Sequence, residues 1–361
     1  MAEYVIEVYS SAGARQATVT DYIGTLSVGL ICNGVDVVKF AIDSSASYAS
    51  YLVSGAIIEV YREDAYAGIA MYRAFAGTVQ AASTTISDTT TIDVTALGMN
   101  FLASTRIVAY PAGVANRTQF TAQPSETIMK TLWNYNVGSL ATTANGRYLD
   151  GRITGATASA TTGAGTSQSI SVAGLNLLNA LQNVQKNAGG DFAVIYTAPA
   201  TWTFTWYTGQ LGTNRSASVI FSVSNGTVGQ MTLNSDNVNF ASAAIVAGQG
   251  EGSARVVVTR PASLPTGLAL KEIWVDARNQ KTVAEYQNLG TATLAQIARD
   301  TSTVDVSIIQ SNALRYGRDY FLGDIVTVDT GSGTVTRKID AVSMKYSKEG
   351  REVVDVGLTA V

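Results

Sequence analysis

The residues that most enzymes use for catalysis and metal binding are scarce in this chain of 361 residues. Histidine is absent, which excludes Ser-His-Asp and Cys-His nucleophilic sites, histidine-ligated zinc and histidine general bases. The single cysteine, Cys32, excludes an intrachain disulfide and any multi-cysteine metal site. Because Cys32 lies in an apolar run, we interpret it as a small core side chain. We therefore expect no catalytic residues, no cofactor and no metal.

Carboxylates are the remaining candidates for acid–base chemistry, and they are scattered along the sequence. A glycosidase needs two carboxyl groups about 5–10 Å apart, but the sequence shows no recognisable pair. We therefore do not predict carboxylate catalysis. The carboxylates considered are Asp191, Asp236, Glu272, Asp276, Asp319 and Asp324.

A glycine-rich segment contains Gly248, Gly250 and Gly252 and invites comparison with a phosphate-binding loop. Such a site requires a strand, the glycine loop and then a helix whose N-terminus faces the anion. Here residues 255–258 read Arg-Val-Val-Val, which predicts a strand, and no Lys-Ser/Thr pair follows. We interpret the segment as a glycine-rich hairpin turn.

An aromatic stripe is formed by Trp202, Phe204 and Trp206, which share one face of a predicted strand while threonines occupy the other. Two interpretations remain open. If exposed, the rings could stack on sugars and bind glycans. If buried, they pack on a predicted helix at 173–188, whose apolar face needs a partner. We favour the second interpretation.

The composition is poor in charge. Charged residues make up 14% of the chain, against an average of about 25%. With 24 Lys and Arg against 27 Asp and Glu, there is no basic excess for wrapping nucleic acid. The first nine residues alternate like a strand rather than a signal peptide, and no apolar run approaches the ~18 residues of a membrane helix. We expect a soluble protein, made in a cytoplasm, that does not insert into membranes.

The pattern of strands and helices expected along the chain predicts a mainly β fold with an α+β middle. We expect two tube-like β-barrel domains, residues 1–105 and 226–361, and smaller mixed domains in 106–225. Many short alternating runs separated by turn residues indicate barrels or sandwiches. A short helix near 291–300 interrupts the last region. The runs of the first region are 4–9, 17–30, 35–42, 56–62, 69–80 and 91–97.

The middle region combines helices and strands. A helix is predicted from Ser125, and a second over 173–188, where Gly189 and Gly190 provide a C-cap. Two strands follow. Residues 154–169 contain Thr, Ser, Ala and Gly without charge, and we predict a flexible loop there.

A weak internal repeat relates the two strand-rich regions. Residues 52–60 and 320–328 both place aliphatic residues three and five positions after a glycine, Gly55 or Gly323. Another predicted strand follows each segment. The pattern is consistent with two β-domains of similar plan, although strand–turn–strand patterns also arise by chance.

The stretch 314–328, LRYGRDYFLGDIVTV, resembles the signature of siphophage tail hub proteins. Its most characteristic residues are Tyr320, Leu322, Gly323 and Asp324. Gly248, Gly250 and Gly252 resemble the glycine loop of the same family. Other stretches match in the same order, so that the resemblance covers nearly the whole chain: 37–42, 52–62, 75–79, 177–196, 246–255 and 271–278.

The resemblance implies a structural virion protein, the baseplate hub at the distal tail tip of a bacteriophage. In that family a homotrimer carries two barrels per subunit, so its ring presents six similar surfaces to a hexameric tail ring. The implied partners are the distal tail protein ring and tail tube, the tape measure protein, and receptor-binding or fibre proteins. The ring surrounds a channel that DNA crosses during genome ejection, without sequence-specific binding.

Two alternatives belong to other functional classes. The first is a carbohydrate-binding adhesin of the tail tip that uses Trp202, Phe204 and Trp206. The second is a cell-wall hydrolase, which the missing histidines argue against. Many family members continue into an enzymatic extension, whereas Val361 follows shortly after the signature. We therefore expect no enzymatic activity.

The charge balance also predicts the character of the channel. Basic walls would retain DNA by counterion release, and basic residues are few. We expect a neutral to acidic channel lined by Ser, Thr, Asn, Asp and Glu, with Lys and Arg at subunit contacts or on the outer surface.

Overall fold

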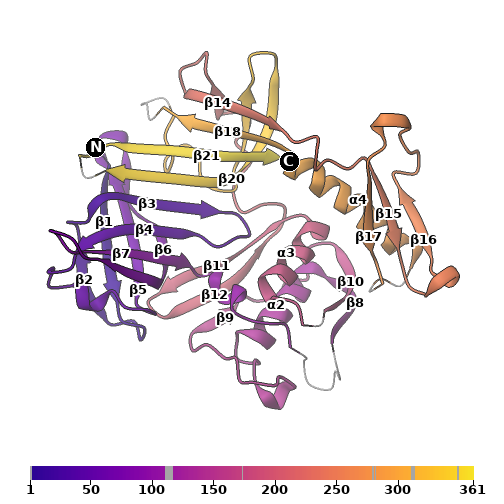
Figure 1. Cartoon of the computed structure of the whole chain (residues 1–361), viewed down its shortest axis with the longest axis horizontal. Helices are drawn as coiled ribbons and strands as arrows, with labels where there is room; N and C mark the ends of the chain where they lie inside the picture. Colours follow the sequence, from indigo (N-terminus) through magenta and orange to yellow (C-terminus); the bar gives the residue numbers. More distant parts are fainter. Residues whose placement is uncertain are drawn as a thin grey trace.

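The computed structural model describes residues 2–109, 117–172, 174–278, 280, 282–309, 314–347 and 349–361. The chain forms one 13-stranded sheet, three smaller sheets and several α-helices (Figure 1). In Figure 1 the large sheet occupies the left and top of the molecule, a helix-containing region lies below it, and a small β-domain lies at the right.

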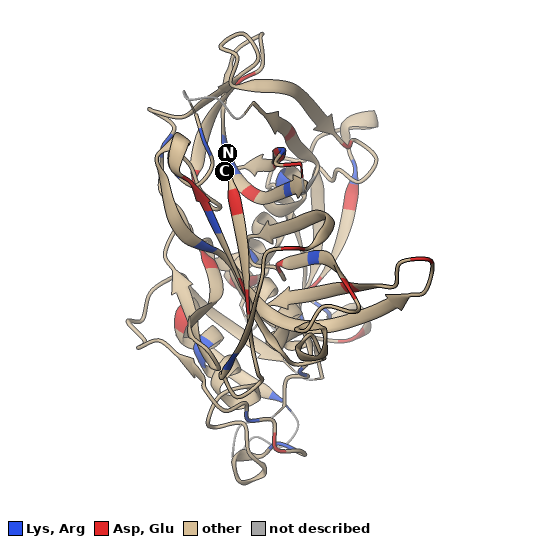
Figure 2. Ribbon diagram, turned by 90° about the vertical axis from the view of Figure 1, so that its left-hand side faces the viewer, with Lys and Arg blue, Asp and Glu red and all other residues tan. Residues whose placement is uncertain are grey.

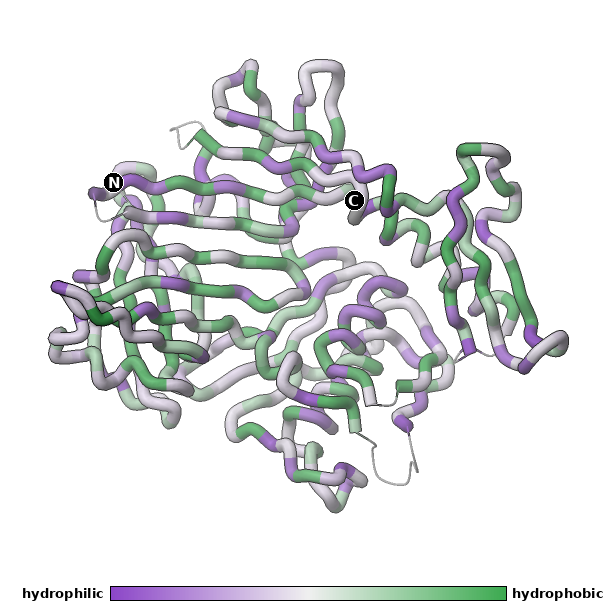
Figure 3. Tube along the Cα trace, viewed as in Figure 1, coloured by the Kyte–Doolittle hydropathy of each residue, from purple (hydrophilic) through white to green (hydrophobic). Residues whose placement is uncertain are grey.

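Seven strands of the large sheet come from the first part of the chain. They are β1 (Glu3–Tyr9), β2 (Arg15–Val19), β3 (Ile23–Ile31), β4 (Val37–Asp43), β5 (Ile57–Asp64), β6 (Ile69–Thr85) and β7 (Thr91–Gly98). Their side chains alternate between core and exterior, as Tyr4, Ile6 and Val8 in β1 are buried between more exposed residues. Figure 3 shows this alternation as bands of apolar and polar residues. The run predicted at 17–30 divides into β2 and β3.

The remaining six strands come from the last part of the chain. They are β13 (Ile220–Ser222), β14 (Val228–Ser235), β18 (Ser302–Ile308), β19 (Ile325–Asp329), β20 (Thr334–Ser347) and β21 (Glu352–Ala360). Their order β19-β20-β21-β18-β14 repeats the order β5-β6-β7-β4-β3 of the first part, with antiparallel pairing throughout. The large sheet is therefore built from two units of the same plan.

The two glycines singled out in the sequence occupy equivalent places in these units. The Gly55 N–H donates to the Val79 carbonyl at 2.9 Å, and the Gly323 N–H donates to the Ile339 carbonyl at 2.8 Å. One residue beyond each acceptor the register shifts, at Val79/Ala81 in β6 and at Ile339/Ala341 in β20. The internal repeat predicted from Gly55 and Gly323 is present in the strand pairing.

The two units are not separate barrels. β20 has 14 residues and β19 only five, so the C-terminal half of β20 extends beyond β19 and pairs with β3, from Ala341–Ile31 to Ser347–Thr25. This pairing fuses both units into one open sheet with β14 and β2 at its ends, and none of the sheets in the described ranges closes into a barrel. The mainly β character was predicted correctly, but barrels are not seen in the single chain.

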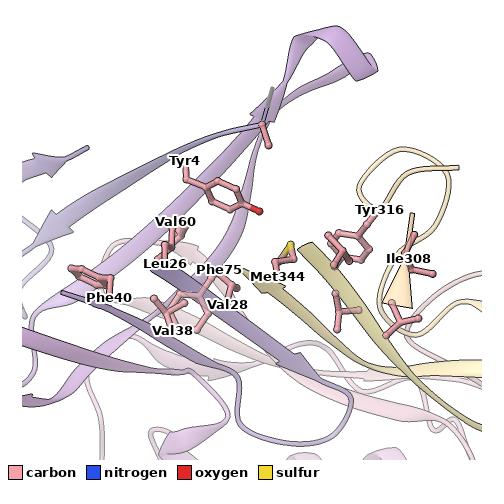
Figure 4. Close-up of a cluster of buried hydrophobic side chains, with 14 of the residues drawn as sticks. Tyr4, Leu26, Val28, Val38, Phe40, Val60, Phe75, Ile308, Tyr316 and Met344 are labelled. Carbon is pink, nitrogen blue, oxygen red and sulfur yellow. The ribbon is translucent and has the colours of Figure 1, made fainter. Parts of the chain in front are cut away.

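One hydrophobic core serves both units. Val28 and Val38 of the first unit and Met344 of the second lie in the same cluster, as Figure 4 shows. Tyr316, from the segment before β19, belongs to this cluster too. Because the apolar faces are continuous, neither unit has a complete core without the other.

The middle region packs two helices against small sheets. Its elements are α1 (Phe101–Ser104), β8 (Thr118–Pro124), α2 (Ser125–Asn136), β9 (Ala156–Ala158), β10 (Ser167–Val172), α3 (Leu177–Ala188), β11 (Asp191–Ala198) and β12 (Thr201–Tyr207). The predicted start of α2 at Ser125 and the end of α3 before Gly189 are confirmed. The apolar faces of both helices belong to a second core.

The loop predicted at 154–169 is ordered by a buried ion pair. Glu126 on α2 accepts from the Lys130 ammonium at 2.5 Å, from the Thr162 N–H at 2.9 Å and from the Ala164 N–H at 2.9 Å. Lys130 also donates to the Ala160 carbonyl at 2.7 Å. The segment includes β9 and the first residues of β10, so the prediction of a structureless loop was wrong.

A small domain is inserted between the antiparallel strands β14 and β18. It contains β15 (Ala243–Ala247), β16 (Val257–Arg260), β17 (Glu272–Asp276) and α4 (Val283–Asp300). α4 has 18 residues and starts well before the helix expected near 291–300. Thr282 and Glu285 form a capping box at its N-terminus, a signal present in the sequence but not used. No helix in the described part of the chain is long and apolar enough to cross a membrane.

Replacing Glu126 with Gln tests how residues 160–164 are held. Burial disfavours the Glu126 carboxylate, but hydrogen bonds from Lys130, Ala164 and Thr162 outweigh it and lower its pKa to about 2. We expect Glu126→Gln to lower the free energy of unfolding by about 3 kcal/mol at pH 7. Because the folded pKa is depressed, the difference from wild type should disappear as pH falls from about 4.5 toward 2.

Urea unfolding between pH 7 and pH 2 measures this difference. The matched control is Glu251→Gln, because Glu251 is exposed. A pH-independent loss in Glu126→Gln, or an equal loss in the control, would contradict the assignment.

Candidate functional site: the joint segment and the polar face

Residues 314–324, here called the joint segment, immediately precede β19 and contain the most characteristic residues of the 314–328 signature. Two glycines shape it, with φ of +88° at Gly317 and +86° at Gly323. A Cβ at Gly317 would lie 2.8 Å from the Tyr72 hydroxyl oxygen, and one at Gly323 would lie 2.6 Å from the Gly212 nitrogen. Both the dihedral angles and the close contacts therefore require glycine.

A buried ion pair beside the joint segment connects the two units. Arg62 of β5 is fully buried and donates to both carboxylate oxygens of Glu352 in β21, at 2.7 and 2.8 Å. It also donates to the Tyr316 carbonyl at 3.0 Å, and Tyr4 donates to Glu352 at 2.6 Å. Burial works against the charged guanidinium, but the hydrogen bonds to Glu352 outweigh it and raise the pKa of Arg62.

A second set of contacts attaches the joint segment to the β5–β6 hairpin. Arg315 pairs with the buried Asp64 at 2.9 Å, and Arg318 donates to the Ala67 carbonyl at 2.8 Å. The sequence analysis missed Arg62 and Asp64. A signal was available, because both continue the inward-facing positions of Ile58 and Val60 along β5.

The characteristic signature residues have structural roles. Tyr320 is fully buried, and its ring lies 5.1 Å from that of Phe221. Leu322 packs against the shared core. Asp324 accepts from the Thr213 N–H at 2.6 Å, the Arg215 guanidinium at 2.8 Å and the Phe321 N–H at 2.8 Å. These contacts fix the joint segment to residues 211–215 of the preceding region.

Asp191 forms a further junction, between the middle region and the large sheet. It is fully buried and accepts from the Lys338 ammonium of β20 at 2.6 Å, from the Asn33 amide at 2.7 Å and from the Leu211 N–H at 2.6 Å. The Asn33 side-chain oxygen in turn accepts from the Phe192 N–H at 2.7 Å. The turn between β3 and β4 is therefore attached to the start of β11.

Three of the other carboxylates considered in the sequence also take part in structural contacts, whereas Glu272 is exposed on β17. Asp319 pairs with Arg318 at 2.8 Å, and Asp276 pairs with both Arg255 and Arg278. Asp236 accepts backbone N–H groups at the start of the inserted domain. Among the described residues, no group of three His, Cys, Asp or Glu is arranged to hold a metal ion.

The glycine loop lies between β15 and β16, which pair as an antiparallel hairpin. A Cβ at Gly248 would lie 2.3 Å from the Tyr286 ring of α4, whereas Gly250 and Gly252 have φ of +106° and +53°. Arg255 donates to the Gly248 carbonyl at 3.0 Å. The interpretation as a glycine-rich turn is confirmed, because the loop leads into a strand and packs against the side of a helix.

The aromatic stripe of β12 is buried. Trp202, Phe204 and Trp206 are 6%, 0% and 7% exposed and belong to the core beneath α2 and α3. The Phe204 ring stacks on Trp133 of α2 at 5.3 Å and on Phe192 of β11 at 5.8 Å. The rings are thus not available for stacking on sugars, which removes the residues proposed for glycan binding.

The outward side of the large sheet is polar where β14, β18, β21, β20, β3, β4 and β7 lie side by side. One row across it pairs Ser307 with Asp355, Asp355 with Ser343, and Ser343 with Gly29. Small and polar side chains dominate this side, which we call the polar face. Its small, polar and charged residues are Gln230, Thr232, Asn234, Asp305, Ser307, Asp355, Gly357, Ala341, Ser343, Lys345, Ser27, Gly29, Lys39, Asp43, Asp93 and Thr95, and the same side also carries Ile31, Val37 and Leu97.

The polar face is hollowed and nearly neutral. A groove of about 680 Å³ lies over it between β14 and β3. Its basic residues are Lys39 and Lys345, which are outnumbered by aspartates, and Figure 2 shows charges of both signs dispersed over the chain. Ile31, Val35 and Val37 line part of this groove, and the face offers no basic belt for phosphates.

The chain matches a known protein family over nearly its whole length. Residues 5–358 match the protein family described as Siphovirus ReqiPepy6 Gp37-like protein. The chain belongs to this family. The resemblance to siphophage tail proteins is confirmed at this level, and the chain is a structural protein of a phage tail. No curated protein matches it.

Solved structures share the fold of this siphovirus tail protein. The tail protein of Neisseria meningitidis MC58 is 12% identical over 99% of this chain and 96% of its own, with a TM-score of 0.62. The 43 kDa tail protein of prophage MuSo2 from Shewanella oneidensis is 12% identical over 98% and 97%, with a TM-score of 0.61. Prophage tail protein gp18 from Listeria monocytogenes is 12% identical over 98% and 94%, with a TM-score of 0.57.

Removing the buried arginine tests the connection between the units. Arg62→Ala leaves Glu352 buried without its partner, so we expect the free energy of unfolding to fall by about 3–5 kcal/mol. The control is Arg15→Ala, whose pair with Glu7 is exposed to solvent and should contribute much less to stability. Denaturant unfolding compares the two variants. Equal losses of unfolding free energy in the two variants would show that the buried Arg62–Glu352 pair stabilises the fold no more than an exposed pair.

A pair of glycine substitutions separates backbone strain from steric conflict in the joint segment. Gly323 and Gly331 have φ of +86° and +82°, but a Cβ at Gly331 would meet no atom within 4 Å. Gly331→Ala should therefore cost about 1 kcal/mol from the left-handed conformation alone. Gly323→Ala must also displace residues 211–212 and should cost about 3 kcal/mol or more. Similar midpoints in urea unfolding would refute the close packing.

Proposed function

We propose that this tail protein is the hub of the tail tip, in which three copies form a ring that closes the tail tube. The observation that carries the proposal is the repeated strand order of the large sheet, β5-β6-β7-β4-β3 and β19-β20-β21-β18-β14. Three copies of a chain with two similar units present six similar surfaces, which can match a hexameric ring of distal tail protein.

In this proposal the polar face lines the channel. A tape measure protein and then DNA must slide along the wall without strong binding, which suits a surface of Ser, Thr, Gly and Asp with few basic residues. Lys345 and Lys39 lie in one row on either side of Ser27, and the row continues to Val353 and Thr95, so the two lysines do not extend into a continuous basic belt. The low charge of the chain supports the same assignment.

The regions take different parts in the proposed ring. Residues 1–105 and 226–361 supply the wall, and closure of the open sheet into a barrel would come with assembly. Residues 106–225 and the inserted domain lie beside the sheet and are free to contact receptor-binding or fibre proteins. Both regions have hydrophobic cores of their own. We propose no enzymatic role for them.

Measurement of mass and shape tests the hub. We expect native mass spectrometry of the purified chain to show trimers, and electron microscopy of the trimer to show a ring with six similar lobes around a channel. Mapping side chains onto that ring should place Asp93, Asp305 and Asp355 toward the axis. A stable dimer, a ring of six chains or a continuous axial belt of Arg and Lys would overturn the proposal.

A further inference from the structure

The repeat also predicts how neighbouring copies join. We infer that β14 of one copy pairs antiparallel with the C-terminal part of β6 in the next copy, with Asn234 opposite Ser83 and Thr232 opposite Thr85. The partner is a second copy of this chain, and the inference rests on the proposed function because it describes contacts within that ring.

Two of the open strand edges in the described part of the chain bear on this contact. β14 pairs with β18 on one side and ends the sheet on the other. β6 pairs with β7 along residues 77–85, but β5 covers its other side only from Ile69 to Thr78. Residues 81–85 are all exposed, as are most residues of β14.

From Gln230 to Ser235 the edge of β14 lacks the features that normally prevent strand addition, because its register shift lies before Gln230. Its sequence, Val-Gly-Gln-Met-Thr-Leu-Asn-Ser, contains no charged residue and no proline over eight residues. Native proteins usually protect a long exposed edge with lysine, proline or a bulge that faces solvent. An unprotected edge of this length indicates a strand that is covered in the functional assembly.

The partner edge follows from the two units. In the large sheet, β3 ends the first unit and pairs with the part of β20 that extends beyond β19. β14 is the counterpart of β3, and β6 is the counterpart of β20. Residues 81–85 of β6 therefore correspond to the part of β20 that β3 occupies, and the matching strand for this position is the β14 of another copy.

The register can be read from the same correspondence. Val79 and Ile339 are equivalent by their hydrogen bonds, so Ser83 corresponds to Ser343, and Ser343 pairs with Gly29. Gly29 pairs with Val37, and the counterpart of Val37 in β18 is Thr303, which pairs with Asn234. Asn234 is thus the counterpart of Gly29 and comes to lie opposite Ser83.

Exposed apolar side chains agree with this register. Leu233 is the counterpart of Val28, which is fully buried in the shared core, yet Leu233 is 55% exposed in the single chain. Ile86, one residue beyond β6, is the counterpart of Tyr346 and is 84% exposed. Pairing of β14 with β6 places both on the apolar side of the joined sheet, where neighbours would cover them.

The contact uses two different edges of the chain and is therefore heterologous. Each copy offers its β14 to one neighbour and its β6 to the other, so the contact repeats around a ring and leaves no open edge once the ring closes. The interface between copies then reproduces the β3–β20 pairing within one copy, which makes the six units nearly equivalent.

Cysteine cross-linking measures the register directly. In Ser83→Cys/Asn234→Cys and Thr85→Cys/Thr232→Cys, the paired positions come within about 5 Å, close enough for a disulfide. In the control Ser83→Cys/Gln230→Cys, the second cysteine lies four residues along β14 from Asn234. The two cysteines are therefore about 13 Å apart. The natural Cys32 stays in all variants, because it is buried and burial raises the pKa of its thiol.

Oxidation should convert both in-register variants into disulfide-linked dimers and closed trimers, at least about tenfold more than the control. Native mass spectrometry of the same samples under reducing conditions gives the oligomeric state. Trimers without in-register cross-links would overturn the inference and leave the proposed hub intact. A chain that stays monomeric without cross-links, or forms another oligomer, would count against both.

A charge at the edge provides an independent test. Leu233→Lys places an ammonium group at a position that is exposed in the monomer and covered in the ring. We expect the concentration for half-dissociation of the trimer to rise by about tenfold or more, with little change in the unfolding midpoint. The control is Val238→Lys, because Val238 is 90% exposed and lies outside the proposed contact. Equal trimer stability in both variants would contradict the inference.

Discussion

The pairing of β3 with the C-terminal half of β20 is the constraint on which the rest of the structure depends. It exists because β20 is much longer than β19, and it turns two similar units into one sheet with one core. The polar face spans the line where they meet. Without this pairing, the apolar sides of both units would lack part of their cover, and the joint segment would have no pair of units to connect.

The chain places much of its limited charge at junctions between regions. Arg62–Glu352 and Arg315–Asp64 connect the two units, whereas Lys338–Asp191 connects the sheet to the middle region. Each buried pair requires good geometry. The free-energy cost of leaving one buried charge without a partner far exceeds the net stabilisation that the pair provides. Ion pairs at such places favour one relative placement of the regions over others, in which the charges would be buried without partners.

The sequence predicted the elements better than their connections. α2 and α3 and most strands follow from local periodicity, and the buried stripe of Trp202, Phe204 and Trp206 follows from the need of a helix for an apolar partner. The pairing of β3 with β20 joins residues more than 300 apart and leaves no local trace. Residues 154–169 looked structureless because the group that orders them, Glu126, lies in a different element.

The inserted domain leaves the sheet at one point and returns to it at almost the same point. The Asp236 N–H donates to the Thr301 carbonyl at 2.8 Å, directly beyond the last paired residues of β14 and β18. The domain also has its own small core around Tyr286. Evolution can therefore exchange, enlarge or delete this module between Asp236 and Thr301 while the ladder of β14 and β18 stays closed. The same position suits the grafting of a foreign domain.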